Sequence, residues 1–180
     1  ELLQYIIDPK ELLKGEAEAL MAGIMLDTKN FSLRTGARTF EAAAFLRRAG
    51  ADTTEVRRFF ENDLPSTISR YEIIKAAKVY RDGMAIAAVD HPVDRVTAAQ
   101  AADELLSVAG VGASFVLFPS EDGRVILSGR SIGEVNVQVI LEALGGGGNA
   151  AAAGAQIADA TLDSVRARLM AAIDNYCETK

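Results

Sequence analysis

Apolar positions in the first half of the chain recur every three or four residues, the spacing of one face of a helix. Gly50 and the Asp63-Leu64-Pro65 run interrupt this pattern, because glycine ends helices and proline suits a first helical turn. We expect helices at Leu2 to Ile7, Glu11 to Leu26, Thr39 to Ala49, Thr54 to Glu61 and Ile68 to Arg81.

The pattern changes at Gly83, after which strand signals appear. A short apolar run, Met84 to Asp90, predicts a strand, and helical spacing follows from Thr97 to Ala109. Two β-rich runs in ASFVLFPSEDGRVILSG are joined by a polar turn across Glu121 to Gly123, which predicts a hairpin. The second half therefore begins in the order β-α-β-β.

The next segment, SIGEVNVQVILEALGGGG, fits either a strand or a helix. Alternating valines favour a strand, whereas Ser131 and Glu134 form a capping box. We predict a helix from Gly133 to Leu144, because the run is long and stops at glycines. A short AGAQI strand and a helix from Leu162 to Tyr176 follow. The pattern predicts a helical segment and then a small mixed α/β domain.

Composition is that of a globular protein, with 49% hydrophobic and 24% charged residues among 180. The longest apolar stretch, Ala19 to Leu26, is far shorter than the roughly 20 residues of a membrane span, so we expect a cytoplasmic chain. The formal net charge of −6 argues against binding of long nucleic acid. One cysteine and one histidine exclude a His/Cys metal site built by this chain alone.

Residues 145 to 154, GGGGNAAAAG, form a loop almost without side chains. It follows a helix and lacks Gly-Lys-Ser/Thr, so it is neither a dinucleotide fingerprint nor a P-loop. Its peptide N–H groups and the amide of Asn149 could form an anion-binding concavity. A helix stop followed by a packing loop explains the composition equally well.

Two further stretches contain candidate chemistry. In LSGRSIGE, Arg130 and Ser131 fall at a predicted strand end and helix start, where a guanidinium and main-chain donors can hold a phosphate. A surface arginine at a strand end is the alternative. Asp27 ends an apolar helix, where a carboxylate is either a cap or a metal ligand.

These stretches occur in one recognisable order. MAGIMLDTKNFSLRTGARTFEAAAFLRRAGAD resembles the fourth motif of the DHH phosphoesterase family. SGRSIGEVNVQVILEALGGGGNAAAAGAQ resembles the substrate-binding domain associated with that family. The sequence of these stretches is similar to that of the GdpP/YybT branch, the membrane-anchored bacterial cyclic-di-AMP phosphodiesterases. The resemblance runs from about Leu2 to Tyr176.

The resemblance implies an α/β architecture in which residues 1–62 are the C-terminal portion of a DHH domain, 63–81 a linker helix and 82–180 the DHH-associated domain. In that family aspartates and histidines hold two metal ions, usually Mn²⁺, and a metal-activated water attacks the phosphodiester. Asp27 matches a late metal-ligating aspartate. The positions matching substrate contacts are Arg130, Ser131, Gly146, Gly147, Gly148 and Asn149.

Two departures from the family pattern limit what this chain does alone. It has no Asp-His-His, so we expect no catalytic residue here, no Mn²⁺ bound by this fragment and no activity without the rest of a parent protein. Asn149 also stands where relatives usually carry a histidine. The expected partner is a cyclic dinucleotide, with membrane attachment only through segments of the parent outside this chain; a homodimer is also compatible.

Two alternatives to the cyclic dinucleotide remain open. The parent could be a phosphodiesterase of short linear RNA, or the chain could be a non-catalytic nucleotide- or RNA-binding module. The acidic balance counts against a long RNA ligand, and the fourth-motif segment counts against a module that acts alone.

Overall fold

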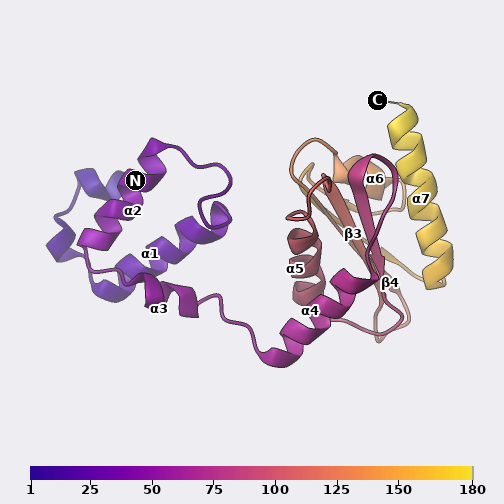
Figure 1. Cartoon of the computed structure of the whole chain (residues 1–180), viewed down its shortest axis with the longest axis horizontal. Coiled ribbons are helices and arrows are strands. Elements are labelled where there is room, and N and C mark those ends of the chain that lie inside the picture. The colour runs from indigo at the N-terminus through magenta and orange to yellow at the C-terminus, as the bar shows by residue number, and fades with distance from the viewer. Residues whose placement is uncertain (180) are drawn as a thin grey trace. The chain divides into compact units, whose positions relative to one another are not determined.

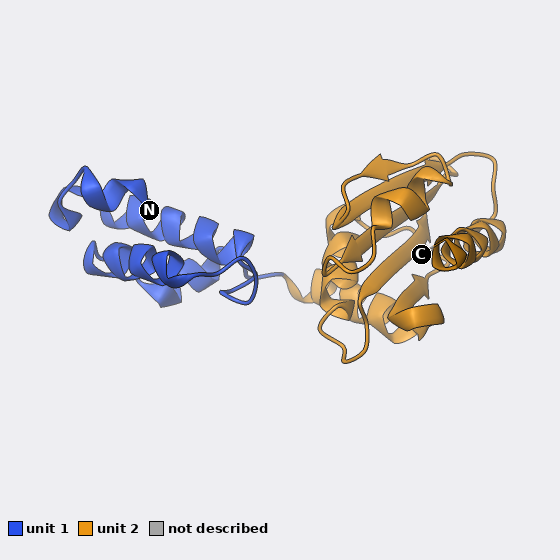
Figure 2. Cartoon of the chain, turned by 90° about the horizontal axis from the view of Figure 1, so that it is seen from above, with its two compact units in different colours: residues 1–62 blue, residues 63–180 orange. Residues whose placement is uncertain are grey.

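The computed structural model describes residues 1–179 and divides into two compact units, Glu1–Asn62 and Asp63–Lys180 (Figure 2). The first unit is helical, with 3₁₀ turns at Leu2–Tyr5 and Pro9–Glu11 and with α1 (Lys14–Asp27), α2 (Ala37–Arg48) and α3 (Thr53–Arg58). None of the described helices combines the length and the apolar content that crossing a membrane requires.

The second unit is a mixed α/β domain (Figure 1). Its elements are α4 (Leu64–Ala76), β1 (Lys78–Val79), a 3₁₀ turn (Arg81–Gly83), β2 (Met84–Ala88), α5 (Arg95–Leu105), β3 (Ala113–Pro119), β4 (Val125–Ser131), α6 (Val137–Glu142), β5 (Gly147–Gly148), β6 (Ala152–Ile157) and α7 (Leu162–Glu178). The mixed α/β class predicted from the sequence is confirmed.

The first unit has a small core in which α1, α2 and α3 meet around Met21, Phe45 and Val56. The helix predicted at Leu2 to Ile7 is wrong, because only a 3₁₀ turn forms there. Proline disfavours helical angles in the residue before it, and Asp8, which precedes Pro9, is extended at φ −72° and ψ 141°. A regular helix therefore starts only at Lys14.

The six strands of the second unit form one sheet in the order β1-β2-β3-β4-β6-β5. β2 and β3 are parallel and are connected through α5, whereas every other neighbouring pair is antiparallel. Parallel neighbours need such a crossover, because the chain must return to the same end of the sheet. The predicted β-α-β-β order and the hairpin of β3 with β4 are confirmed.

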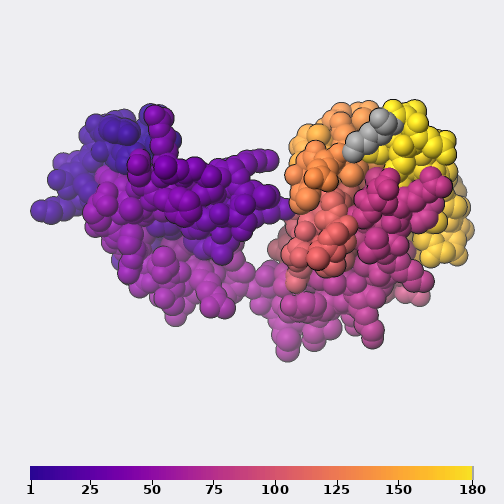
Figure 3. Space-filling view, turned by 45° about the horizontal axis from the view of Figure 1, so that its top comes forward, coloured from indigo at the N-terminus to yellow at the C-terminus, as the bar shows by residue number. Residues whose placement is uncertain are grey.

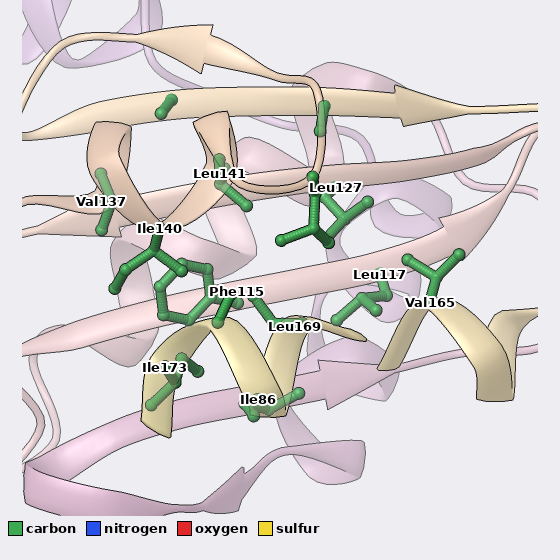
Figure 4. Close-up of a cluster of buried hydrophobic side chains, with 14 of the residues drawn as sticks. Ile86, Phe115, Leu117, Leu127, Val137, Ile140, Leu141, Val165, Leu169 and Ile173 are labelled. Carbon is green, nitrogen blue, oxygen red and sulfur yellow. The ribbon is translucent and has the colours of Figure 1, made fainter. Parts of the chain in front are cut away.

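Strand alternation gives this sheet two buried faces. On one face Phe115 and Leu127 pack with Ile140 of α6 and Leu169 of α7 (Figure 4). On the other face Val116 and Phe118 of β3 pack with residues of α5. The helices thus cover opposite faces, and α7 forms part of the outer surface of this unit (yellow in Figure 3). Consecutive residues of one strand consequently serve different layers.

The helix predicted from Ile68 to Arg81 starts earlier and ends at Ala76. Asp63 begins it, because its side chain accepts a hydrogen bond from the backbone N–H of Ser66 at 2.7 Å. Beyond Ala76 the chain is extended, and β1 pairs with β2. Ile73 of α4 is fully buried in the core between α5 and the sheet, so this helix is an integral part of the second unit.

The helix predicted from Gly133 to Leu144 exists but covers only Val137–Glu142. The expected capping box is wrong: Asn136 is the cap, and its side chain accepts from the backbone N–H groups of Gln138 and Val139 at 3.1 and 3.4 Å. Ser131 instead ends β4. The valine alternation that suggested a strand reflects a short helix with one face in the core, where Val137 and Ile140 are buried.

Burial of Ile73 predicts a clear contrast within α4. Replacing Ile73 with alanine should lower the free energy of unfolding of the second unit by about 2 to 5 kcal/mol, because it leaves a cavity in a packed core. Ile68→Ala is the matched control, since Ile68 lies on the same helix and is 50% exposed. Urea unfolding measures both changes. Equal effects would show that α4 does not contribute to this core.

Candidate functional site

A cavity of about 670 Å³ lies on the α5 side of the sheet. Side chains of β4 that point to this side, Ser128 and Arg130, stand opposite Gly154 and Ala152 of β6 in the strand register. The lining is Arg95, Ala99, Phe118, Ile126, Leu127, Ser128, Arg130, Gly145, Gly146, Gly147, Gly148, Ala152, Ala153, Gly154, Ala155 and Gln156. Residues of β3, β4, β5 and β6 thus form its floor, and the start of α5 forms a wall.

Small residues keep this part of the sheet open. α5 packs on β3 and β4, while the positions of β6 that stand beside Ser128 and Arg130 carry only Gly154 and Ala152. Beyond β6, the edge strand β5 consists of glycine alone. A ligand here can approach the backbone closely, since almost no side chain stands in between.

Arg130 is held in a fixed orientation at one end of the cavity. Its Nη1 donates to the carbonyl of Gly129 at 2.9 Å and lies 3.4 Å from the Ser128 hydroxyl. Its Nε forms an ion pair of 3.6 Å with Asp103 of α5, and 22% of the arginine side chain is exposed. The guanidinium therefore has N–H groups available to an anion at small cost in side-chain entropy.

The cavity is positively charged. Arg130 and Arg95 are the only charged residues among its described lining, and both are cations. Arg95 is exposed at the first position of α5, and its Nη2 donates to the side-chain oxygen of Gln156 on β6 at 3.2 Å. A concave, cationic surface with a glycine floor can accept a phosphate or a similar anion.

The glycines of the loop have separate roles. A Cβ at Gly146 would collide with the carbonyl oxygen of Gly154 and lie 2.7 Å from the Cβ of Ala155. Gly148 has φ +149°, and a Cβ there would lie 2.9 Å from the Cβ of Ala153. A Cβ at Gly147 would meet nothing within 4 Å. Packing thus demands glycine at two of these positions, whereas at Gly147 the fold does not.

Asn149 closes the turn between β5 and β6. Its side-chain oxygen accepts from the backbone N–H groups of Ala151 and Ala152 at 3.0 and 2.9 Å. It is not among the lining residues of the cavity. The single amide that the sequence retains in this loop therefore has a local structural use, as an Asx-type turn.

Ser131 is not brought together with Arg130, although the two are neighbours in sequence. It is buried on the opposite face, and its hydroxyl accepts from the N–H of Gly133 at 3.0 Å. The main-chain donors expected beside it are also displaced, because α6 begins only at Val137. The structure thus places Ser131 and the start of α6 away from the side of the sheet on which Arg130 lies.

In the first unit, Asp27 ends α1 and is followed by an unusual backbone. Lys29, Asn30 and Phe31 all have positive φ, at 44°, 56° and 62°. The hydroxyl of the buried Thr28 stabilises this loop. It donates a hydrogen bond to the carbonyl oxygen of Ile24 at 2.7 Å and accepts one from the backbone N–H of Phe31 at 2.9 Å. Left-handed angles in consecutive non-glycine residues cost energy and are concentrated at functional sites.

Asp27 alone does not make a metal centre. Its carboxylate is 70% exposed and forms an ion pair of 3.3 Å with Arg34. Within residues 1–179, no group of three or more histidine, cysteine or acidic side chains is arranged to hold a metal ion. A two-metal centre needs several such ligands, so the described residues do not fit one by themselves.

Sequence reasoning missed Arg95, Ser128 and Gln156 as parts of the cavity. Ser128 shares a strand face with Arg130, so its two-residue spacing was a usable signal. Gln156 lies on the same face of β6 as Gly154, again two residues away. Arg95 comes from a helix distant in sequence, and only the crossover that places α5 on this face brings it near.

Comparison with known proteins identifies a domain in the second half of the chain. The family model described as the DHHA1 domain matches residues 81–179. This match contains α5, both long strands of the hairpin, the glycine loop and α7, and therefore the whole described lining of the cavity.

Named relatives match almost the entire chain. The cyclic-di-AMP phosphodiesterase PdeA of Listeria monocytogenes is 47% identical over 178 residues, which cover 98% of this chain and 27% of the relative. The cyclic-di-AMP phosphodiesterase GdpP of Bacillus subtilis is 46% identical over 184 residues, with 99% and 28% coverage. The chain thus spans about a quarter of the length of the curated relatives it matches.

A solved structure confirms the fold. An exopolyphosphatase-related protein from Bacteroides fragilis superposes with a TM-score of 0.85, covering 97% of this chain and 54% of that one. The sequence identity is 19%, so this likeness concerns the fold alone.

The glycine loop allows packing to be separated from ligand contact. Gly146→Ala should lower the free energy of unfolding by about 1 to 3 kcal/mol, because the methyl group is forced into β6. Gly147→Ala should change it by less than about 1 kcal/mol, because its position is open. Thermal unfolding of the two variants provides the measurement. Comparable loss in both would contradict the assigned packing.

Proposed function

The chain belongs to the DHHA1 domain family, and on this premise we propose that its second unit binds cyclic-di-AMP as the substrate-recognition part of a metal-dependent phosphodiesterase. The observation that supports this most directly is the cationic cavity between Arg130, Arg95 and the glycine floor. A cyclic dinucleotide carries two phosphates and two flat bases, which such a surface can hold through charge and through close backbone approach.

In this proposal Arg130 binds one phosphate of the ligand. The bond to Gly129 orients the guanidinium before the ligand arrives, so little rotamer freedom is lost on binding. Gly147 lets a ribose or base lie against the backbone of β5, whereas Gly146 and Gly148 act indirectly by keeping β5 against β6. Asn149 supports the same edge through its turn.

The relatives support the choice of ligand. Both are named cyclic-di-AMP phosphodiesterases and align with nearly all of this chain at 46–47% identity. Because the chain spans 27–28% of their length, hydrolysis is assigned to a complete parent protein rather than to these residues. Manganese, a membrane anchor of the parent and a homodimer stay predictions from the resemblance.

Asp27 is proposed as one metal ligand of that parent. Its exposed carboxylate lies directly before a loop whose left-handed residues are fixed by Thr28, and this would present the carboxylate in a defined direction. The ion pair with Arg34 would have to open for a metal ion to bind. The other ligands would lie outside the described residues.

Loss of Arg130 should weaken binding of cyclic-di-AMP. Arg130→Ala is expected to cost about 1 to 3 kcal/mol, because a charge-assisted contact to phosphate disappears. Titration calorimetry of the 180-residue chain measures the change. Arg168→Ala is the matched control, since Arg168 is exposed on α7 and does not line the cavity. Equal affinities in two folded variants would eliminate this role.

The isolated chain should bind cyclic-di-AMP without hydrolysing it. Incubation with Mn²⁺ and cyclic-di-AMP is expected to yield no linear dinucleotide by chromatography, since Asp27 is the sole proposed metal ligand among the described residues. Conversion at a substantial rate would show that the chain assembles a metal centre from its own side chains.

A further inference from the structure

A carboxylate stands beside the arginine that is proposed to bind a phosphate. The Nε atom of Arg130 lies 3.6 Å from a carboxylate oxygen of Asp103, which belongs to the crossover helix α5. Asp103 is not among the described residues that line the cavity, so a ligand there contacts Arg130 and not this carboxylate. By charge alone Asp103 disfavours a bound anion, because like charges repel. A favourable effect on the site has to come through the geometry of Arg130.

The contacts of Arg130 come from two different elements. The carbonyl oxygen of Gly129 and the hydroxyl of Ser128, both on β4 itself, lie 2.9 and 3.4 Å from Nη1. Asp103 approaches Nε from α5, which packs on this face of the sheet (Figure 1). A planar guanidinium that is held at one atom can still pivot, whereas contacts at two of its atoms fix its plane.

The ion pair orients the guanidinium through charge. A separation of 3.6 Å is longer than a hydrogen bond, so the attraction of Nε to the carboxylate is Coulombic. The exposed fractions are 22% for the Arg130 side chain and 39% for that of Asp103, so water screens the pair less than one on an open surface. Nε faces Asp103 and Nη1 faces β4, which leaves the N–H groups of Nη2 for a phosphate oxygen.

The main chain at Asp103 is anchored on both sides. The buried hydroxyl of Ser114 on β3 donates to the carbonyl oxygen of Ala102 at 2.5 Å. On the other side, the carboxylate of Glu104 forms an ion pair of 3.1 Å with Nε of Arg70 on α4. The carboxylate of Asp103 therefore starts from a defined point over the sheet, and its short side chain has few rotamers to lose.

Close packing of α5 brings this carboxylate within reach of β4. Ala98, Ala101 and Ala102 are fully buried between the helix and the sheet. Such small side chains fill little space, so the helix axis lies near the strands. An aspartate, which has a short side chain, can therefore meet an arginine that rises from the neighbouring strand.

We propose that Asp103 is a positioning residue, which holds the guanidinium of Arg130 in the orientation that binds phosphate although its own charge opposes that phosphate. The inference rests on the proposed function and adds to it a residue that the ligand does not contact. The orienting effect is the larger of the two, because ordering one arginine side chain in advance is worth about threefold to tenfold in affinity. The repulsion is weakened by the water that reaches the exposed part of Asp103.

Titration calorimetry with cyclic-di-AMP and the 180-residue chain tests the sign of the effect. Asp103→Asn keeps the shape of the side chain and removes its charge, and it should weaken binding about threefold to tenfold. Asp103→Glu keeps the charge and should recover most of the affinity. Stronger or unchanged binding by Asp103→Asn would overturn the proposal, since simple relief of repulsion predicts that result.

The matched control is Asp163→Asn. It also removes a carboxylate from an ion pair with an arginine, Arg166, but on α7 and outside the described lining of the cavity. Its affinity for cyclic-di-AMP should equal that of the unmodified chain, and thermal unfolding shows whether each variant is folded. A loss as large as that of Asp103→Asn would assign the effect to net charge and overturn the proposal.

A double-variant cycle separates positioning from support of the fold. In Arg130→Ala there is no guanidinium to orient, so adding Asp103→Asn should not weaken binding further and should strengthen it by up to about threefold. An equal loss with and without Arg130 would show that Asp103 acts through the packing of α5 instead, which contradicts the proposal.

The mobility of Arg130 can be measured without a ligand. Nitrogen relaxation by NMR of its Nε–H group, identified by its absence in Arg130→Ala, should show faster motion in Asp103→Asn than in the unmodified chain. Asp103→Glu should resemble the unmodified chain. Equal mobility in all three proteins would overturn the positioning role.

The outcomes also distinguish this inference from the proposed function. If the unmodified chain does not bind cyclic-di-AMP, the proposed function is overturned, and the positioning role in binding falls with it. If the chain binds and Arg130→Ala weakens binding while Asp103→Asn does not, the positioning role alone is wrong. Losses in both variants that are not additive in the cycle support the proposal.

Discussion

The alternation of side chains along β4 is the constraint on which the second unit depends. Leu127 and Gly129 point to the face covered by α6 and α7, where a Cβ at Gly129 would lie 3.1 Å from Leu141. Ser128 and Arg130 point to the opposite face. Leu127 and Gly129 face the core, so these positions need an apolar side chain or none. Ser128 and Arg130 face away from that core, so these positions can hold polar side chains. A register shift of one residue would exchange the two functions.

The edge of the sheet follows from the same constraint. β5 can lie against β6 only because Gly146 and Gly148 lack a Cβ, which at these two positions would collide with the backbone of Gly154 and with Ala153. Asn149 then satisfies two backbone N–H groups in the tight turn that joins the strands. The absence of side chains thus has a structural cause first, and the open floor beside Arg130 is its consequence. Packing and ligand access are two results of one sequence feature, which explains why composition alone left both interpretations open.

Much of the fold could be predicted from the sequence because the signals are local. The hairpin of β3 and β4 shows strand alternation around a turn, and α5 and α7 show helical spacing. Predictions failed where helix ends are decided: only a 3₁₀ turn forms at Leu2–Tyr5, with Asp8 extended before Pro9, and Asn136 rather than Ser131 caps α6. Boundaries depend on caps and on pairing partners, which a single periodic pattern does not contain.

The same limit applies to the cavity. Arg130 and the glycines could be predicted as site residues because they lie within recognisable stretches of sequence. Arg95 is far from them in sequence, and only the crossover through α5 brings it to the same cavity. The charge of the cavity also differs from that of the whole protein. The protein as a whole has a formal net charge of −6, yet the described lining of the cavity contains two cations and no carboxylate. Because screening limits electrostatic effects to about 8 Å, local charge governs a bound anion while the acidic remainder disfavours a long polyanion.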